Sequence, residues 1–155
     1  MAIDKKDREI LQLLQTNASL SLAEVASAVN LTQTPCWRRI QKLQGDGVIQ
    51  KQVALCDPKK LNLGLTTFVT IRTSQHNEQW MQRFVAGATS IPEIVEIYRL
   101  SGNSDYLLKI VVPDISRYDT VYKRLIRTVD LLDVSSAFVM ETIKCTTALP
   151  LDYAE

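Results

Sequence analysis

Hydrogen-bond donors and positive charge are concentrated in one short stretch, LTQTPCWRRIQKLQGDGVI, which spans residues 31–49. An arginine guanidinium can bind the two acceptors of guanine, a glutamine amide can bind adenine, and basic side chains bind phosphates. This is the chemistry of a contact with double-stranded DNA, although a solvated helix face has the same composition. The residues that carry it are Thr32, Gln33, Thr34, Arg38, Arg39 and Lys42.

These residues divide by the kind of contact that each could make. Gln33, Thr34 and Arg38 are placed for base edges, and Arg39 and Lys42 suit phosphates. The first group would determine sequence preference, and the second would add affinity without reading sequence.

Two further residues lie beside this set. Lys51 belongs to VIQKQVALC (48–56), which is predicted as a strand next to the helix, and it would add one phosphate contact. Trp37 is expected to pack under the helix or against that strand instead of reading a base.

Three helices must position the donors. The first is predicted over residues 4–15 from the spacing of its apolar side chains, and the second over 21–30, where Ser21 begins a capping box. The third begins at Thr32, with Pro35 in its first turn, where the missing N–H costs little. A scaffold helix followed by two short helices and a tight turn predicts a helix-turn-helix, whose second helix lies in the major groove of DNA.

The pattern changes from residue 65 onward, where strand and helix signatures follow the order β-α-β-β-α-β. That order is the ferredoxin-like motif, an antiparallel sheet with both helices on one face. The fold class is therefore predicted as α+β, an N-terminal winged helix-turn-helix followed by a C-terminal ferredoxin-like domain. The predicted strands are 65–73, 93–100, 106–112 and 134–145, and the predicted helices are 77–89 and 115–129.

We place the domain boundaries by these changes of pattern. Residues 1–50 form the helix-turn-helix domain, 51–63 a hinge strand and linker, and 64–155 the ferredoxin-like domain. The strands of the last domain carry more apolar surface than two helices on one face can cover. We therefore expect a partner subunit on the other face of the sheet.

Charge and composition limit the class of protein. The chain of 155 residues has a net charge of only +1, but residues 1–60 hold nine Lys/Arg against six Asp/Glu, so the basic excess lies in the predicted helix-turn-helix. No apolar run reaches the roughly 18 residues of a membrane span, and the N-terminus does not resemble a signal peptide. The sequence therefore predicts a cytoplasmic protein without membrane contact.

Metal and disulfide chemistry are not expected. The three cysteines, Cys36, Cys56 and Cys145, are too few and too widely spaced for a disulfide framework or a metal clip. All three are expected to be reduced and buried, and no cofactor is predicted. No nucleophile–base pair or phosphate-cradling glycine loop indicates a catalytic residue.

Three segments, TPCWRRIQKLQGDGVI, SGNSDYLLKIVVPD and SSAFVMETIKCTTALPL, together resemble the Lrp/AsnC family of prokaryotic transcription regulators over nearly the whole chain. The resemblance implies that the C-terminal domain forms homodimers, which commonly assemble into octamers, and binds a small effector, usually an amino acid. The ending IKCTTALPL is similar to the branch that responds to cysteine, so the effector would be cysteine or a small apolar amino acid.

The same resemblance places the effector at the loop between the second and third strands and at the start of the last strand. Asp105 could accept the ammonium of an amino acid, and the N–H groups of the loop could hold its carboxylate. The sequence Gly-Asn-Ser-Asp is equally ordinary hairpin chemistry. The effector residues implied are Gly102, Asn103, Ser104, Asp105, Tyr106, Val134, Ser135 and Ser136.

Two other functions remain open at this point. An architectural DNA-compacting regulator would have the same fold without an obligatory ligand, and it would bind DNA broadly. A small amino-acid-metabolising enzyme on the ferredoxin-like domain is a further alternative, which turnover of an amino acid would favour.

Overall fold

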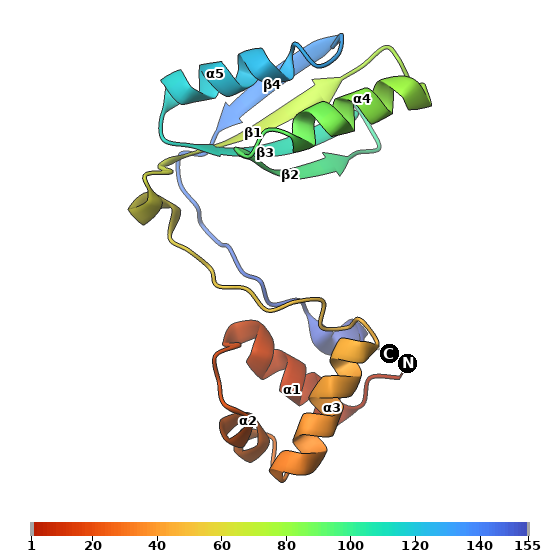
Figure 1. Ribbon diagram of the computed structural model, residues 1–155, viewed down its shortest axis with the longest axis vertical. Helices are drawn as coiled ribbons and strands as arrows, with labels where there is room; N and C mark the ends of the chain where they lie inside the picture. Colours follow the sequence, from red (N-terminus) through yellow and green to blue (C-terminus); the bar gives the residue numbers. More distant parts are fainter. Residues whose placement is uncertain (1, 155) are drawn as a thin grey trace. The chain divides into compact units, whose positions relative to one another are not determined.

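The computed structural model describes residues 2–154, which form two compact units. Residues 2–55 and 143–154 make the helical unit, and residues 56–142 make the sheet unit (Figure 1). This division differs from the expected boundaries at the C-terminus, because 143–154 belong with the helix-turn-helix and not with the sheet. Within residues 2–154 no helix has the length and apolarity to cross a membrane.

The helical unit consists of α1 (Lys5–Thr16), α2 (Leu22–Ala28) and α3 (Gln33–Gly45). The first two helices begin with reciprocal capping boxes, Asp4 with Asp7 and Ser21 with Glu24, each of which satisfies free N–H groups at the helix start. Asn30, with φ 54°, makes the left-handed turn between α2 and α3. The core of this unit is formed by Ile10, Leu11, Val25, Ala26, Val29, Cys36 and Leu43.

The prediction of a strand after α3 is wrong for the single chain. Residues 48–57 have no regular secondary structure, and a 3₁₀ turn, η1 (Pro58–Leu61), follows. A single strand without a neighbour leaves its backbone N–H and C=O groups unpaired, and the helical unit, to which residues 48–55 belong, has no strand among its described residues. Lys51 therefore lies in an exposed irregular segment and not on a wing strand.

The sheet unit has the predicted ferredoxin-like order. Its strands are β1 (Leu65–Arg72), β2 (Ile94–Arg99), β3 (Tyr106–Val112) and β4 (Asp133–Phe138), arranged β2-β3-β1-β4 with every neighbouring pair antiparallel. The helices α4 (Glu78–Thr89) and α5 (Ile115–Leu125) cover one face, as Figure 1 shows. Their contact with the sheet buries Val69, Ile71, Phe84, Leu108, Ile110, Val112, Val121 and Leu125.

The last strand is shorter than predicted. It ends at Phe138, which pairs with Thr67, and the N–H of Val139 makes one further bond to the carbonyl of Thr66. Because β1 begins at Leu65, which the register places opposite residue 140, no neighbour remains for residues 141–145. Met140 is accordingly exposed, and the segment leaves the sheet.

The face of the sheet opposite the helices is open in the chain. Alternation along β1 places Phe68 and Thr70 on this face, where their register partners are Lys109 and Leu107. Tyr98 on β2 is 49% exposed beside them. The open face is therefore partly apolar, as the sequence predicts.

Candidate functional site

The outer face of α3 carries the donors singled out in the sequence. Cys36 and Leu43 are fully buried against α1 and α2, so the residues half a turn away from them face solvent. Thr34, Arg38 and Gln41 form this outer stripe and are all exposed. Arg38 makes no ion pair with any described residue, so its guanidinium is available to a partner.

The start of α3 also exposes donors. Thr32 occupies the N-cap position, but its side chain makes no capping hydrogen bond, and Gln33 is exposed beside it. The first turn of α3 therefore presents hydroxyl and amide groups to solvent. In DNA-binding helix-turn-helix units these N-terminal positions face base edges.

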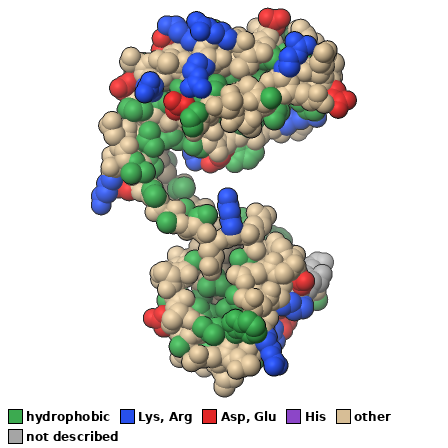
Figure 2. Space-filling view, viewed as in Figure 1, with side chains coloured by type: hydrophobic (Ala, Val, Ile, Leu, Met, Phe, Trp, Pro, Cys, Tyr) green, Lys and Arg blue, Asp and Glu red, His purple; other side chains and the backbone are tan. Residues whose placement is uncertain are grey.

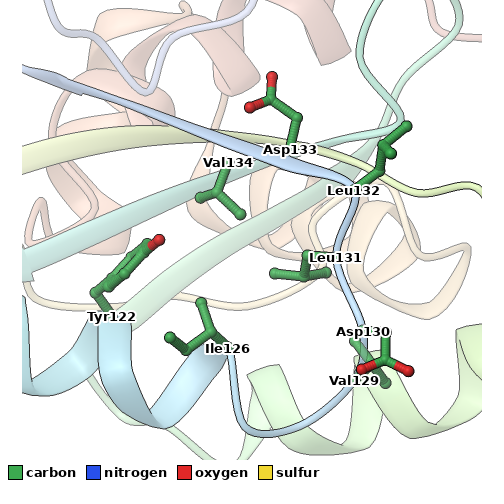
Figure 3. Close-up of a pocket in the computed structure, with 8 residues that line it drawn as sticks. All are labelled: Tyr122, Ile126, Val129, Asp130, Leu131, Leu132, Asp133 and Val134. Atoms are coloured by element: carbon green, nitrogen blue, oxygen red, sulfur yellow. The ribbon is translucent and has the colours of Figure 1, made fainter.

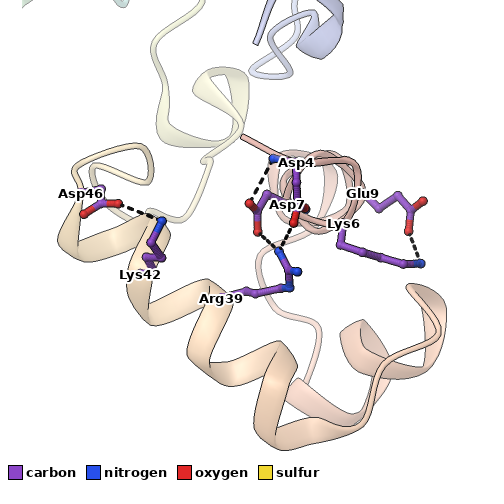
Figure 4. A network of polar contacts seen from close by, with 7 residues as sticks. All are labelled: Asp4, Lys6, Asp7, Glu9, Arg39, Lys42 and Asp46. Carbon is purple, nitrogen blue, oxygen red and sulfur yellow. Dashed lines mark hydrogen bonds and ion pairs between the residues drawn. The ribbon is translucent and has the colours of Figure 1, made fainter. Parts of the chain in front are cut away.

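Arg39 is held within the helical unit (Figure 4). Its Nη1 donates to Asp4 Oδ2 at 2.7 Å and to Asp7 Oδ1 at 2.8 Å. The hydrogen bond that Arg39 donates to Asp7, followed by the one that it donates to Asp4, raises the pKa of Arg39 above its ordinary value. The guanidinium thus joins α3 to the start of α1, whereas the sequence analysis predicts that it contacts a DNA phosphate.

Lys42 points outward one turn further along α3. Its Nζ lies 3.7 Å from Asp46 Oδ2, and both side chains are well exposed, so the ion pair is weak and screened by solvent (Figure 4). Lys42 is therefore able to exchange this partner for a phosphate.

Two expectations about buried side chains are wrong. Trp37 is 51% exposed and does not pack under α3, because Cys36 and Ile40 occupy the inward positions. Of the cysteines, only Cys36 is buried, and burial raises the pKa of its thiol. Cys56 and Cys145 are exposed free thiols, since both lie in irregular segments outside the two cores.

The two segments that the sequence analysis assigns to the effector, 102–106 and 134–136, lie on either side of the end of β1. Ile71 pairs with Tyr106 of β3 on one side and with Val134 of β4 on the other. Neighbouring strands are about 4.8 Å apart, so the two segments are separated by about 10 Å. Tyr106 itself is buried and belongs to the core. The centroid of its ring lies 4.7 Å from the ring centroid of Phe84.

Asp105 fixes the loop to β1. Its Oδ2 accepts from the N–H of Thr73 at 2.8 Å, and its own N–H donates to the carbonyl of Ile71. The second oxygen, Oδ1, lies 4.0 Å from His76 Nδ1, and the side chain is 29% exposed. Gly102 has φ 127°, a conformation that favours glycine. Asn103 is exposed and Ser104 half-buried in the same turn.

The residues of β4 point to both faces of the sheet. Ser135 is paired with Thr70 and lies on the open face, while Val134 and Ser136 face the helices. The Ser136 hydroxyl makes a short hydrogen bond with the hydroxyl of Tyr118 on α5. Burial is the main cause that raises the pKa of Tyr118.

A cavity of about 460 Å³ lies between α5 and β4 (Figure 3). Val134 is the one lining residue that the sequence analysis names. Of the others, Tyr122 lies in α5, two follow its end, and four form the DLLD segment (130–133), whose carboxylates and leucines carry no recognisable motif. The lining residues are Tyr122, Ile126, Val129, Asp130, Leu131, Leu132, Asp133 and Val134.

A metal site is not found among residues 2–154, since no three His, Cys, Asp or Glu side chains there are grouped to hold an ion. The described residues provide two candidate binding surfaces. One is the outer face of α3, which exposes hydrogen-bond donors, and the other is the cavity between α5 and β4, whose lining includes Asp130 and Asp133.

Comparison with protein families matches both units. The model of the AsnC-type helix-turn-helix domain matches residues 3–44, and that of the Lrp/AsnC ligand binding domain matches residues 66–149. The chain is 50% identical over 151 residues to the DNA-binding transcriptional activator DecR of Escherichia coli (strain K12), covering 97% of this chain and 99% of that protein.

Solved structures agree with these matches. An AsnC family transcriptional regulator from Agrobacterium tumefaciens superimposes with a TM-score of 0.93 at 55% identity, covering 97% of this chain and 98% of that one. A transcriptional regulator from Neisseria meningitidis, solved as a complex with L-Met, gives 0.93 at 33% identity, covering 98% and 99%. With both domains in this order and full-length relatives, the chain belongs to the Lrp/AsnC family of DNA-binding transcriptional regulators.

Proposed function

We propose that the outer face of α3 enters the major groove of the operator. Gln33, Thr34 and Arg38 would contact base edges, and Thr32, Lys42 and Lys51 would contact phosphates and backbone. The observation that carries this assignment is the exposed guanidinium of Arg38 on the outer stripe of α3, which has no ion-pair partner within residues 2–154. Arg39 is better suited to positioning α3, because both of its partners are carboxylates of the same unit.

Binding to duplexes selected from a random library tests this assignment. Arg38→Ala should lower affinity for the selected duplex more than for random DNA, because a guanine contact carries sequence information. Lys42→Ala should weaken both equally and reduce the salt slope by about 1. Arg83→Ala, an exposed residue of α4, is the matched control. Unchanged affinity of Arg38→Ala would contradict the assignment.

A second copy of the chain is proposed to cover the open face of the sheet. A dimer would place two recognition helices about 34 Å apart, one turn of DNA. A mostly apolar cavity of about 470 Å³ at the edge of this face supports the assignment, since a dimer would fill it. Its apolar lining includes Leu61, Leu63, Pro92, Val95 and Val111.

Assembly is measurable by light scattering. Phe68→Asp places a charge in the middle of the open face and should give monomers, while Val85→Asp on the outer side of α4 is the control. Assembly of Phe68→Asp like the wild type would exclude the open face. The mass of the wild type also decides whether dimers associate further into octamers.

The proposed effector is a free α-amino acid at the loop of Asp105, either cysteine or a small apolar one. Asp105 Oδ1 would accept the ammonium, and the N–H groups of Gly102, Asn103 and Ser104 would hold the carboxylate. Val134 would contact the side chain, and the L-Met complex of the Neisseria relative supports this ligand class. Binding would alter DNA affinity through a coupling of about 1–3 kcal/mol.

A thermal-shift screen of the proteinogenic amino acids identifies the effector, because a ligand of the folded state raises Tm. Asp105→Asn keeps an acceptor for the Thr73 N–H but removes the negative charge, so it should lose the shift and retain basal DNA binding. If Asp130→Asn loses the shift instead, the ammonium lies in the cavity beside α5. No shift with any amino acid at millimolar concentration would favour an architectural regulator without a ligand.

The protein is proposed to act by binding and not by catalysis, in the cytoplasm where its DNA lies. The named relatives are regulators, which supports this assignment. Consumption of the effector during the screen would contradict it.

A further inference from the structure

Trp37 differs from the other tryptophan of the chain in having neither a core position nor a hydrogen-bond partner among the described residues. Trp80 is 4% exposed, stacks on Phe84 and donates its Nε1 to the carbonyl of Asp130 at 3.0 Å. Trp37 leaves 51% of its surface exposed on α3. A large exposed aromatic side chain is typical of a contact with a partner.

The position of Trp37 on α3 identifies the partner. Thr34 precedes it by three residues and Gln41 follows it by four, so all three side chains lie on neighbouring turns of one side. Arg38 is the next residue and Lys42 follows one turn later, which makes the surroundings of the indole basic. Figure 2 shows hydrophobic and basic side chains side by side on the surface of the helical unit.

Positive charge around an apolar group fits DNA better than a second protein surface. The major groove contains one prominent apolar group, the 5-methyl group of thymine, and apolar side chains contact it directly. Consecutive base pairs are about 3.4 Å apart, similar to the roughly 3.8 Å between the Cα atoms of consecutive residues such as Trp37 and Arg38. The indole and the guanidinium of Arg38 can therefore reach neighbouring base pairs.

We propose that Trp37 is a specificity-determining residue that packs its indole on the 5-methyl group of a thymine adjacent to the base pair read by Arg38. This inference rests on the proposed function of α3 as the recognition helix. It adds a contact with the thymine methyl group, which a hydrogen-bond donor cannot make.

Replacement of thymine by deoxyuracil tests the contact, because uracil keeps every hydrogen bond and lacks only the methyl group. The full-length protein first selects its preferred duplex from a random library, and each thymine is then replaced singly. At one thymine in each half-site the wild type should bind the uracil duplex about three- to fivefold more weakly, as expected for one buried methyl group. Trp37→Ala should bind both duplexes equally.

Arg38→Ala is the matched variant in the same helix turn. It should lose affinity for the selected duplex but keep the wild-type ratio between thymine and uracil. A wild type that binds both duplexes equally, with Arg38→Ala still impaired, would overturn the role of Trp37 and leave the recognition helix in place. If neither Trp37→Ala nor Arg38→Ala affects binding, α3 does not contact DNA, and the proposed function itself fails.

A contact with a second copy would give a different result. Light scattering of free Trp37→Ala should give the same mass as the wild type, since the residue is assigned to DNA. A lower mass would assign the indole to a subunit interface and overturn the proposal.

Discussion

The guanidinium of Arg39 in α3 lies 2.8 Å from the carboxylate of Asp7 in α1, although 32 residues separate them in the sequence. Asp7 has a side chain only 11% exposed, and it also closes the capping box of α1 with Asp4. One arginine thus connects the recognition helix to the cap of the scaffold helix. This connection adds to the apolar packing that holds α3 against α1.

Removal of Arg39 should destabilise the helical unit, in contrast to removal of its neighbour. Arg39→Met leaves the nearly buried carboxylate of Asp7 without its cation, and we expect the free energy of unfolding to fall by about 1–3 kcal/mol. Arg38→Met, with no ion pair among the described residues, should stay within about 0.5 kcal/mol of the wild type. Urea denaturation of both variants checks this, and equal losses would contradict it.

Asp4 should make this unit sensitive to acid. The hydrogen bond from the N–H of Asp7, followed by that from Arg39, lowers the pKa of Asp4 below its ordinary value. The unfolded state therefore binds the proton more tightly, so the contribution of Asp4 is complete above about pH 4 and is lost as the pH falls through the lower, folded pKa. The effect is small, because the side chain is 52% exposed.

Asp4→Asn isolates this contribution, since asparagine is an equally good N-cap and does not titrate. We expect the variant to be less stable than the wild type at pH 7 and equally stable at pH 2. Hydrogen exchange of α1 peptides measures the difference. If the difference in stability between the wild type and Asp4→Asn stays constant from pH 7 to pH 2, the charge of Asp4 does not contribute to stability.

The elements that the sequence predicts well are those whose signals are local. The capping box at Ser21 and the apolar spacing of α1 act within one or two turns, and the structure confirms both of them. The order β-α-β-β-α-β is confirmed for the same reason. Local chemistry is enough to define these elements.

The features that were missed depend on residues far apart in the chain. The ion pairs of Arg39 come from helix packing, and the exposure of Trp37 follows from Cys36 and Ile40 filling the inward positions. The strand predicted over 48–56 has the right composition but no neighbour in the chain. The DLLD lining of the cavity has no motif and is defined only by the packing of α5 on β4.

A buried hydroxyl in β1 should be dispensable. Thr67 Oγ1 is fully buried on the helix-covered face and has no hydrogen-bond partner among the described residues. Thr67→Val replaces it by a methyl group of similar size, so stability should be unchanged or rise by about 1 kcal/mol. Thr73→Val is the control. The Thr73 hydroxyl accepts a hydrogen bond from the N–H of Gln75, so its removal should lower the stability of the protein. The Tm of Thr67→Val should equal or exceed that of the wild type, and the Tm of Thr73→Val should fall.

The C-terminal segment should stabilise the helical unit and not the sheet. Leu149 N–H donates to Gln15 Oε1 at 2.7 Å, Arg8 donates to the carbonyl of Ala154, and Leu151 packs against the helical core. Removal of residues 143–155 should therefore speed hydrogen exchange in α1 and leave β1 unchanged. Leu151→Ala should lose about 1 kcal/mol of this protection, whereas Leu149→Ala, 70% exposed, should lose little. Equal protection of α1 with and without the segment would mean that these contacts contribute no stability, and a change confined to β1 would assign the segment to the sheet unit.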